Sequence, residues 1–224
     1  MRLPMIVVLC ISVLVSACGP HPTASPLVVS EYPLGVGTRD LRSVRLRVSS
    51  GALAASSGGW LHVAVPGMRA EASDRSSGDD AELRFVYRGR SVGSSPLADG
   101  TLRRQIGIKL RAQDTCNVVY VMWHFEPTFG IHVSVKSNPH ASRHAECGAG
   151  GYANVPPAYA APVPIAAKSA VRVLRAAIYG DRLKVWVDEN VVWEGALPPA
   201  AMTLEGPIGV RSDNGEFDFT LHAH

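Results

Sequence analysis

The sequence lacks any concentrated run of lysine or arginine, and its charge is nearly balanced. Of its 224 residues, 22 are Lys or Arg and 19 are Asp or Glu, which gives a formal net charge of +3 at pH 7. Proteins that bind nucleic acid through its backbone need a strong basic patch to neutralise phosphates. We therefore do not expect this chain to bind nucleic acid.

Signatures of several common enzyme classes are also missing. No glycine-rich loop stands between a predicted strand and a predicted helix, which argues against nucleotide binding. No Gly-x-Ser-x-Gly motif occurs, which argues against the usual serine hydrolase arrangement. Long helical periods rich in Leu, Glu and Lys are absent, whereas Val, Ser and Gly are plentiful. The composition thus favours an all-β fold, and nothing in it calls for a cofactor.

The apolar run at residues 5–15 is too short to cross a bilayer as a helix, which takes about 20 residues. It follows Arg2 closely and has the length of a signal-peptide core. It ends in Val15–Gly19, which resembles the bacterial lipobox of an aliphatic residue, small residues and a cysteine. The resemblance implies that residues 1–17 are a signal peptide and that Cys18 carries lipid, including palmitate-like acyl chains. An ordinary buried N-terminal strand is the alternative.

Residues 18–38 are expected to form a flexible tether, because Pro, Ser and Gly are frequent there. The residue after the lipidated cysteine is Gly19 rather than Asp, which by resemblance to enterobacterial lipoproteins favours the outer membrane. The chain is therefore expected to be exported and lipid-anchored in the bacterial cell envelope, on its periplasmic or surface face. The remaining residues, 39–224, are expected to form a single domain.

Two of the four cysteines, Cys10 and Cys18, are assigned to the signal peptide and the lipid. Cys116 and Cys147 remain, and in an oxidising compartment such a pair usually forms a disulfide. The bond would close a loop of roughly 30 residues and stabilise the domain. The alternative is a metal site shared with histidines close to Cys147.

Segments in which apolar and polar residues alternate predict strands. Turn sequences such as Asp213–Gly215 separate them. Many short strands at this spacing predict a two-sheet antiparallel β-sandwich or jelly roll, whereas residues 137–168 read as one long irregular connection. The expected strands are 44–48, 60–65, 82–87, 104–111, 118–125, 131–136, 171–179, 182–187, 191–194, 207–212 and 216–222.

The last third of the chain resembles a known family. Gly180–Asp188 and then Gly206–Gly215 look like the closing strands of concanavalin A-like lectin and glucanase domains. That group includes laminin-G-like modules and periplasmic sugar-hydrolase-like domains. The resemblance implies an all-β, two-sheet jelly roll, but it implies little about function because the fold hosts lectins, hydrolases and adhesion modules.

Retaining glucanases of this fold carry Glu-x-Asp-x-Glu on one strand, which places three carboxylates on one face. The sequence has no such triplet. Its nearest match is Glu216-Phe217-Asp218, followed by Thr220, which reads as the solvent face of the last strand. This departure from the family pattern counts against glucanase activity.

Three consecutive predicted strands offer a surface rich in ionisable groups. If strands 104–111, 118–125 and 131–136 pair in order, alternation places their polar residues on one face. That face could bind a sugar acid or another anionic glycan, or it could be an ordinary solvated face with cross-strand charge pairs. The candidate ligand-binding residues on it are Lys109, Arg111, Tyr120, His124, Glu126, His132 and Lys136.

Other roles remain open for some of these residues. Trp186 lies on the polar side of its own predicted strand, where it could stack on a sugar ring or pack beneath a loop. His124 and Glu126 could serve as a general acid and base. Two sets of side chains could be considered as metal ligands, but neither spacing matches a compact motif and no metal is expected. These sets are His124, Glu126 and His132 on the face, and His140, His144 and Glu146 in the loop.

The sequence predicts a membrane-anchored lipoprotein whose β-sandwich domain binds carbohydrate or another cell-envelope ligand without catalysis. Its expected partners are the membrane, through the lipid on Cys18, and a glycan. Two alternatives stay open. The first is a glycoside-active enzyme that uses His124 and Glu126, and the second is a structural or protein-interaction lipoprotein.

Overall fold

A computed structural model describes residues 42–74, 78–165 and 168–224. All of these residues belong to one compact unit. The predicted signal peptide, the lipidated Cys18 and the predicted tether at residues 18–38 lie outside the described residues. In the part of the chain that is described, no helix is long and apolar enough to span a membrane.

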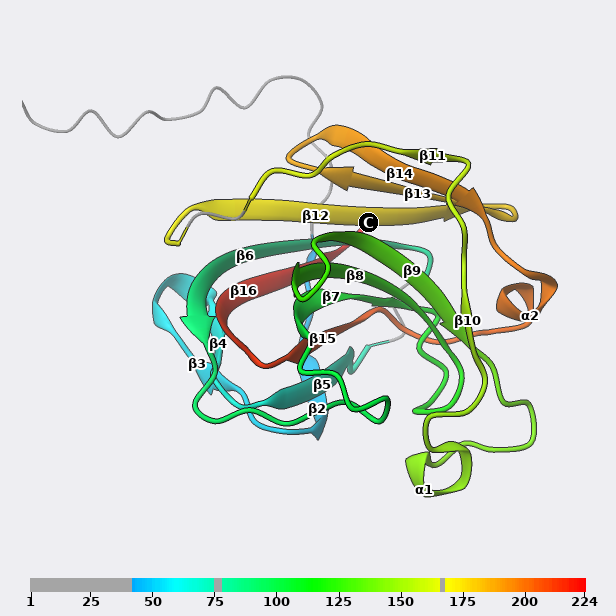
Figure 1. Cartoon of the computed structure of the whole chain (residues 1–224), viewed down its shortest axis with the longest axis horizontal. Helices are drawn as coiled ribbons and strands as arrows, with labels where there is room; N and C mark the ends of the chain where they lie inside the picture. Colours follow the sequence, from blue (N-terminus) through cyan, green and yellow to red (C-terminus); the bar gives the residue numbers. More distant parts are fainter. Residues whose placement is uncertain (1–41, 75–77, 166–167) are drawn as a thin grey trace, which may run out of the picture. The chain divides into compact units, whose positions relative to one another are not determined.

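The described residues form two antiparallel sheets that face each other (Figure 1). The larger sheet contains, in spatial order, β11 (Tyr159–Ala160), β14 (Asn190–Ala196), β13 (Arg182–Val187), β12 (Val171–Tyr179), β6 (Asp80–Arg90), β16 (Gly215–Ala223), β4 (Leu61–Val63) and β3 (Ala54–Ala55), with β1 (Arg42–Ser43) beside β16. The smaller sheet contains β10 (Tyr152–Asn154), β9 (Gly130–Lys136), β8 (Val118–Glu126), β7 (Arg104–Leu110), β15 (Gly209–Asp213), β5 (Gly67–Ala72) and β2 (Leu46–Ser50). Short helices are η1 (Ser57–Gly59), α1 (His144–Cys147) and α2 (Pro199–Met202). The predicted two-sheet β-sandwich is therefore confirmed.

The hydrophobic core fills the space between the sheets, and strand alternation explains which side chains enter it. Phe85 of the larger sheet meets Trp123 of the smaller sheet edge to face, with ring centroids 5.4 Å apart. Aromatic rings favour this geometry because a positive edge meets a negative face. The buried members from β7, β8 and β16 are Ile106, Ile108, Leu110, Val119, Val121, Trp123, Phe217, Phe219 and Leu221.

The sequence did not predict β5, β3, β10 or β11. β5 begins at Gly67, directly after Pro66, and this Pro-Gly pair reads as a turn. β3, β10 and β11 are too short for an alternation pattern to be recognised. They are defined by their partner strands in the folded sheets rather than by local sequence.

A single residue connects β15 in the smaller sheet with β16 in the larger sheet. That residue is Asn214, whose φ of 53° lies in the left-handed region that asparagine tolerates better than most residues. Its side chain accepts a hydrogen bond from the backbone N–H of Ser95 and donates to the carbonyls of Ser95 and Arg103. Asn214 therefore fixes both the change of sheet and the 91–103 loop.

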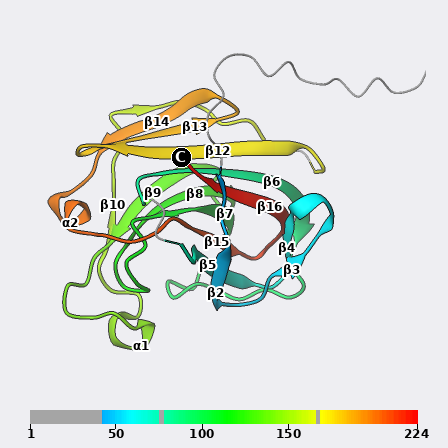
Figure 2. The same ribbon diagram turned by 180° about the vertical axis from the view of Figure 1, so that it is seen from behind.

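The connection between β9 and β12 is more ordered than the sequence indicated. The predicted Cys116–Cys147 disulfide is confirmed, and α1 ends at Cys147. The chain then forms β10 against β9 and β11 against β14. Figure 2 shows the same arrangement from behind, with this segment running from one sheet to the other.

A candidate ligand-binding face on the smaller sheet

The three strands that the sequence singled out do pair in the predicted order. Tyr120 of β8 lies opposite Lys109 of β7 on one side and Ser134 of β9 on the other. Their polar side chains therefore share the face that points away from the core. β8 and β9 bend so that this face lies on the inside of the curve (Figure 1).

The structure extends this surface over three more strands. β15 and β5 follow β7 in the sheet, and β10 follows β9. We call the whole outer surface of these strands the polar face. Its side chains are Arg69, Glu71, Gln105, Lys109, Tyr120, Met122, His124, His132, Ser134, Lys136, Tyr152, Asn154, Arg211 and Asp213.

Much of the polar face is packed rather than solvated. Gln105, Lys109, Tyr120, His124 and Lys136 are all buried, although none of them points into the core between the sheets. Buried polar groups are stable only when they are hydrogen-bonded or paired. The face is therefore a second packed layer, and its side chains are held in place by one another.

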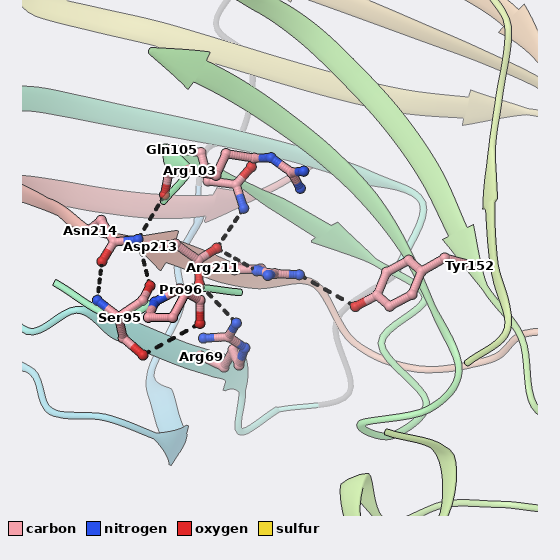
Figure 3. A network of polar contacts seen from close by, with 9 residues as sticks. All are labelled: Arg69, Ser95, Pro96, Arg103, Gln105, Tyr152, Arg211, Asp213 and Asn214. Carbon is pink, nitrogen blue, oxygen red and sulfur yellow. Dashed lines mark hydrogen bonds and ion pairs between the residues drawn. The ribbon is translucent and has the colours of Figure 1, made fainter. Parts of the chain in front are cut away.

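Asp213 lies at the centre of this layer (Figure 3). Its carboxylate accepts hydrogen bonds from Arg69 at 2.9 Å, Arg211 at 2.7 Å and Gln105 at 2.5 Å. Asp213 is only 1% exposed. Burial by itself would raise the pKa of this carboxyl, but Arg211 and Arg69 outweigh it and hold the pKa below its ordinary value. Asp213 is consequently ionised at neutral pH.

Arg211 joins Asp213 to an aromatic pair. Its guanidinium carbon lies 5.1 Å from the centre of the Tyr120 ring, and Nη1 donates to the Tyr152 hydroxyl at 3.4 Å. The two tyrosine rings stack, with centroids 6.0 Å apart and planes inclined by 23°. Tyr152 is 44% exposed, so part of this residue remains accessible to a ligand.

Lys109 and Lys136 are both committed to partners within the protein. Lys109 forms a buried ion pair with Glu71, and burial lowers the pKa of Lys109 although Glu71 opposes the shift. Lys136 is 1% exposed and donates to the carbonyls of Thr115 at 3.2 Å and Gly148 at 2.8 Å. These contacts make both lysines positioning residues for the face.

His124 and His132 stack with ring centroids 3.8 Å apart. Burial and, after it, the neighbouring His132, Arg103 and Arg211 lower the pKa of His124 to about 3. Burial and Arg103 also lower the pKa of His132. Both rings are therefore neutral at pH 7 and present hydrogen-bonding nitrogens rather than charges.

Glu126 does not join the polar face. A register shift between Arg104 and Gln105 places Arg104 opposite Glu126. Arg104 forms an ion pair with Glu126 and also donates to the Tyr87 hydroxyl of the larger sheet at 2.6 Å. A bulge of this kind turns the following side chains to the other face, so His124 and Glu126 cannot act together on one ligand.

Arg111 and Trp186 also lie away from the polar face. Arg111 follows the end of β7, where it pairs with Asp79 at 2.5 Å and donates to the Ala201 carbonyl. Trp186 lies on the outer side of the larger sheet, where Arg175 and Lys184 approach its ring. Neither residue can contribute to a site centred on Asp213 and Tyr152.

No group of three or more His, Cys, Asp or Glu side chains that could hold a metal occurs among the residues that the structure describes. In the loop, Glu146 instead accepts hydrogen bonds from the backbone N–H groups of Ser142 and Arg143 at the start of α1. This contact stabilises the helix start.

The comparisons with known proteins support the fold. The chain is similar to the carbohydrate binding module CBM66 from Bacillus subtilis, with 14% identity and a TM-score of 0.55 over 81% of this chain and 97% of that module. It is also similar to a putative glycosyl hydrolase from Parabacteroides distasonis, with 10% identity and a TM-score of 0.50 over 83% of this chain and 100% of that protein. No protein-family model matches the chain, and no curated protein sequence matches it. At these identities the likeness shows a shared β-sandwich fold.

Proposed function

We propose that the polar face binds carbohydrate without catalysis and that a lipid on Cys18 holds the domain in the bacterial cell envelope. The observation that carries the binding proposal is the exposed ring of Tyr152 beside the fixed network of Arg211 and Asp213. Aromatic rings offer an apolar surface to sugar rings, and fixed polar groups orient their hydroxyls.

Exposed polar groups next to Tyr152 complete the proposed contact surface. Asn154 is exposed on the same strand, and Ser134 lies opposite it on β9 with partial exposure. His132, which precedes Ser134 by two residues in β9, is exposed on the same face. This surface offers amide, hydroxyl and neutral imidazole groups, which can both donate and accept hydrogen bonds. The two solved structures named above, a carbohydrate binding module and a putative glycosyl hydrolase, support this proposal by their shared fold.

The carboxylates of the polar face are poorly suited to glycoside hydrolysis. A general acid must hold a proton near neutral pH, whereas the pKa of Asp213 is lowered. Glu71 is buried and bound to Lys109, and it also accepts a hydrogen bond from Ser49 at 3.0 Å. Because both carboxylates serve the packing of the face, we favour binding over catalysis.

Replacement of Tyr152 by alanine tests the binding site. We expect the full-length protein, purified in mild detergent, to be retained by at least one of a panel of immobilised polysaccharides that includes peptidoglycan. The Tyr152→Ala variant should bind that polysaccharide about tenfold more weakly, which corresponds to ~1.4 kcal/mol. Tyr179→Ala is the matched control, because Tyr179 is an exposed tyrosine on the outer side of the larger sheet.

The same assay separates the alternatives. Soluble sugar released from the panel would favour the hydrolase-like enzyme. An equal loss of retention in both tyrosine variants would move the site away from the polar face. No retention on any polysaccharide would favour the protein-interaction alternative.

The anchoring proposal depends on the lipobox-like Val15–Gly19. We expect the unchanged protein to sediment with membranes of the expressing bacterium. The Cys18→Ala variant should not incorporate radiolabelled palmitate, because the thiol that accepts the lipid is gone. Equal palmitate labelling of both proteins would contradict lipidation at Cys18.

A further inference from the structure

The polar face carries more basic than acidic side chains. The imbalance comes from six residues on the four strands β5, β7, β9 and β15. The basic residues are Arg69, Lys109, Lys136 and Arg211, and the acidic residues are Glu71 and Asp213.

The internal partners leave part of this positive charge uncompensated. Arg69 and Arg211 lie directly opposite each other on β5 and β15, and both bond to Asp213. Two guanidinium groups thus share one carboxylate. Like charges placed opposite each other on neighbouring strands repel, so an additional anion nearby would lower the electrostatic energy.

Lys136 adds a positive charge without adding a bonded carboxylate. The acceptors of its ammonium group are two carbonyl oxygens and the Cys147 sulfur at 3.1 Å. Asp114 acts on it only through space, and Arg211 and Arg69 oppose that effect. The Lys136 ammonium also lies 5.2 Å from the centre of the Tyr152 ring.

The loops at the two ends of the face do not cancel the surplus. At one end Arg103 pairs with Asp99 at 2.9 Å. At the other end Arg143, the residue that caps the start of α1, and Glu146 within α1 carry opposite charges. Each of these two segments carries equal numbers of opposite charges, so the surplus of positive charge comes from the strands.

The titration of neighbouring groups is consistent with a positive field. After burial, His132, Arg103 and Arg211 lower the pKa of His124. Burial and then Arg211 lower the pKa of Lys136. Groups on the face are discouraged from taking up further positive charge, as expected where cations outnumber anions.

We propose that the ligand of the polar face is an acidic glycan, whose carboxylate or sulfate groups lie over Arg69 and Arg211 beside Tyr152. This inference rests on the proposed function and specifies its ligand class. Arg69 is the accessible cation of the set, since its side chain is 27% exposed. The buried guanidinium of Arg211, beside the Tyr152 hydroxyl, contributes mainly through its field in a poorly hydrated environment.

The test compares glycans that differ only in charge. We would measure retention of the full-length protein in detergent on polygalacturonate and on its methyl ester, and on dextran sulfate and on dextran. We expect at least one acidic form to bind about tenfold or more tightly than its neutral counterpart. That binding should weaken steeply between low and high NaCl, because salt screens the attraction. The carboxylate and sulfate arms of the experiment tell the two anionic groups apart.

Variants of Arg69 assign the effect to the polar face. Arg69→Gln should weaken binding to the acidic form several-fold and leave binding to the neutral form unchanged, whereas Arg69→Lys should retain most of the affinity. Arg84→Gln is the charge-matched control, because Arg84 is a partly exposed arginine on the outer side of the larger sheet. This control variant should bind both forms like the unchanged protein.

Several outcomes would overturn the proposal. Equal binding to the acidic and neutral forms would reject an acidic ligand while leaving carbohydrate binding intact. A uniform loss of affinity for both forms in Arg69→Gln would show that Arg69 only supports the packing. Equal retention on immobilised DNA would show unspecific ion exchange. No retention on any glycan would reject the proposed function itself.

Discussion

Replacing Asp213 by asparagine is expected to lower the free energy of unfolding by about 3–5 kcal/mol. The substitution keeps the shape of the side chain but removes the charge that Arg69 and Arg211 share. Two guanidinium groups would then face each other without a counter-ion in a buried setting. Glycan binding should be lost as well, because the same carboxylate orients Arg211 toward the Tyr152 hydroxyl.

The cost of Asp213→Asn should depend on pH in a defined direction. The folded-state pKa of Asp213 lies below its ordinary value, so the unfolded chain takes up the proton first as pH falls. The stabilisation by this carboxylate is complete above the unfolded pKa of about 3.9 and disappears as pH falls through the lower folded pKa. The difference in stability between the unchanged protein and the variant should therefore narrow in acid.

Urea unfolding at pH 7 and at stepwise lower pH measures both effects. Glu194→Gln is a suitable control, because the Lys184–Glu194 pair at 2.7 Å lies in a partly exposed setting on the larger sheet. Exposed pairs of this kind contribute about 0–1 kcal/mol. A cost for Asp213→Asn as small as that of the control would show that the network contributes little to stability.

Removal of the Cys116–Cys147 disulfide is the second change with a large expected effect. On the chain-entropy account, a bond between residues 31 apart in sequence stabilises the fold by about 3–4 kcal/mol. Loss of the disulfide should also disturb the packing of the polar face. Two of the acceptors of Lys136, at Cys147 and Gly148, belong to this loop, and Tyr152 follows only a few residues later.

We expect Cys116→Ser/Cys147→Ser to unfold at lower urea concentration and to lose most of its glycan retention. Thiol reduction of the unchanged protein should have the same two effects. Treatment of the double variant with the same reductant provides the control, since it has no bond left to break. Full retention of glycan by the reduced protein would contradict the coupling between the disulfide and the face.

Most of the strands could be predicted from sequence because each contains its own signal. In β12 and β13 the alternation spans the complete strand, and the observed bounds match the expected ones. The order of β7, β8 and β9 could also be predicted, since consecutive antiparallel strands commonly pair with each other. These local rules were enough to place Lys109, Tyr120, His124, His132 and Lys136 on one surface.

The other half of the face depends on long-range order that alternation does not reveal. β15 lies between β7 and β5 although these three strands are distant in sequence. Arg211 belonged to an expected strand, so its side could be predicted, but its neighbours could not. Asp213 was read as part of a turn, and it is in fact the last residue of β15.

One irregularity explains why Glu126 does not lie on the face that the alternation predicts. One register shift between Arg104 and Gln105 turned Glu126 away from His124, and no sequence signal marked it. Trp186 lies on the polar side of its strand as expected, but that strand, β13, belongs to the larger sheet. The sequence does not predict Tyr152 as a site residue, because β10 is a short strand within a segment rich in Gly and Pro.

The segment that carries Tyr152 also has a consequence for solubility. Unpaired strand edges are templates for association between chains, and proteins protect them with short or irregular covering strands. β10 covers β9, and β11 covers β14, so one stretch of chain shields an edge of each sheet. Between them Val155 donates to the carbonyl of Val133 and Ala158 to that of Glu194. Detachment of this stretch would expose the edges of both sheets at once and so favour aggregation. Its attachment therefore protects the protein even without ligand.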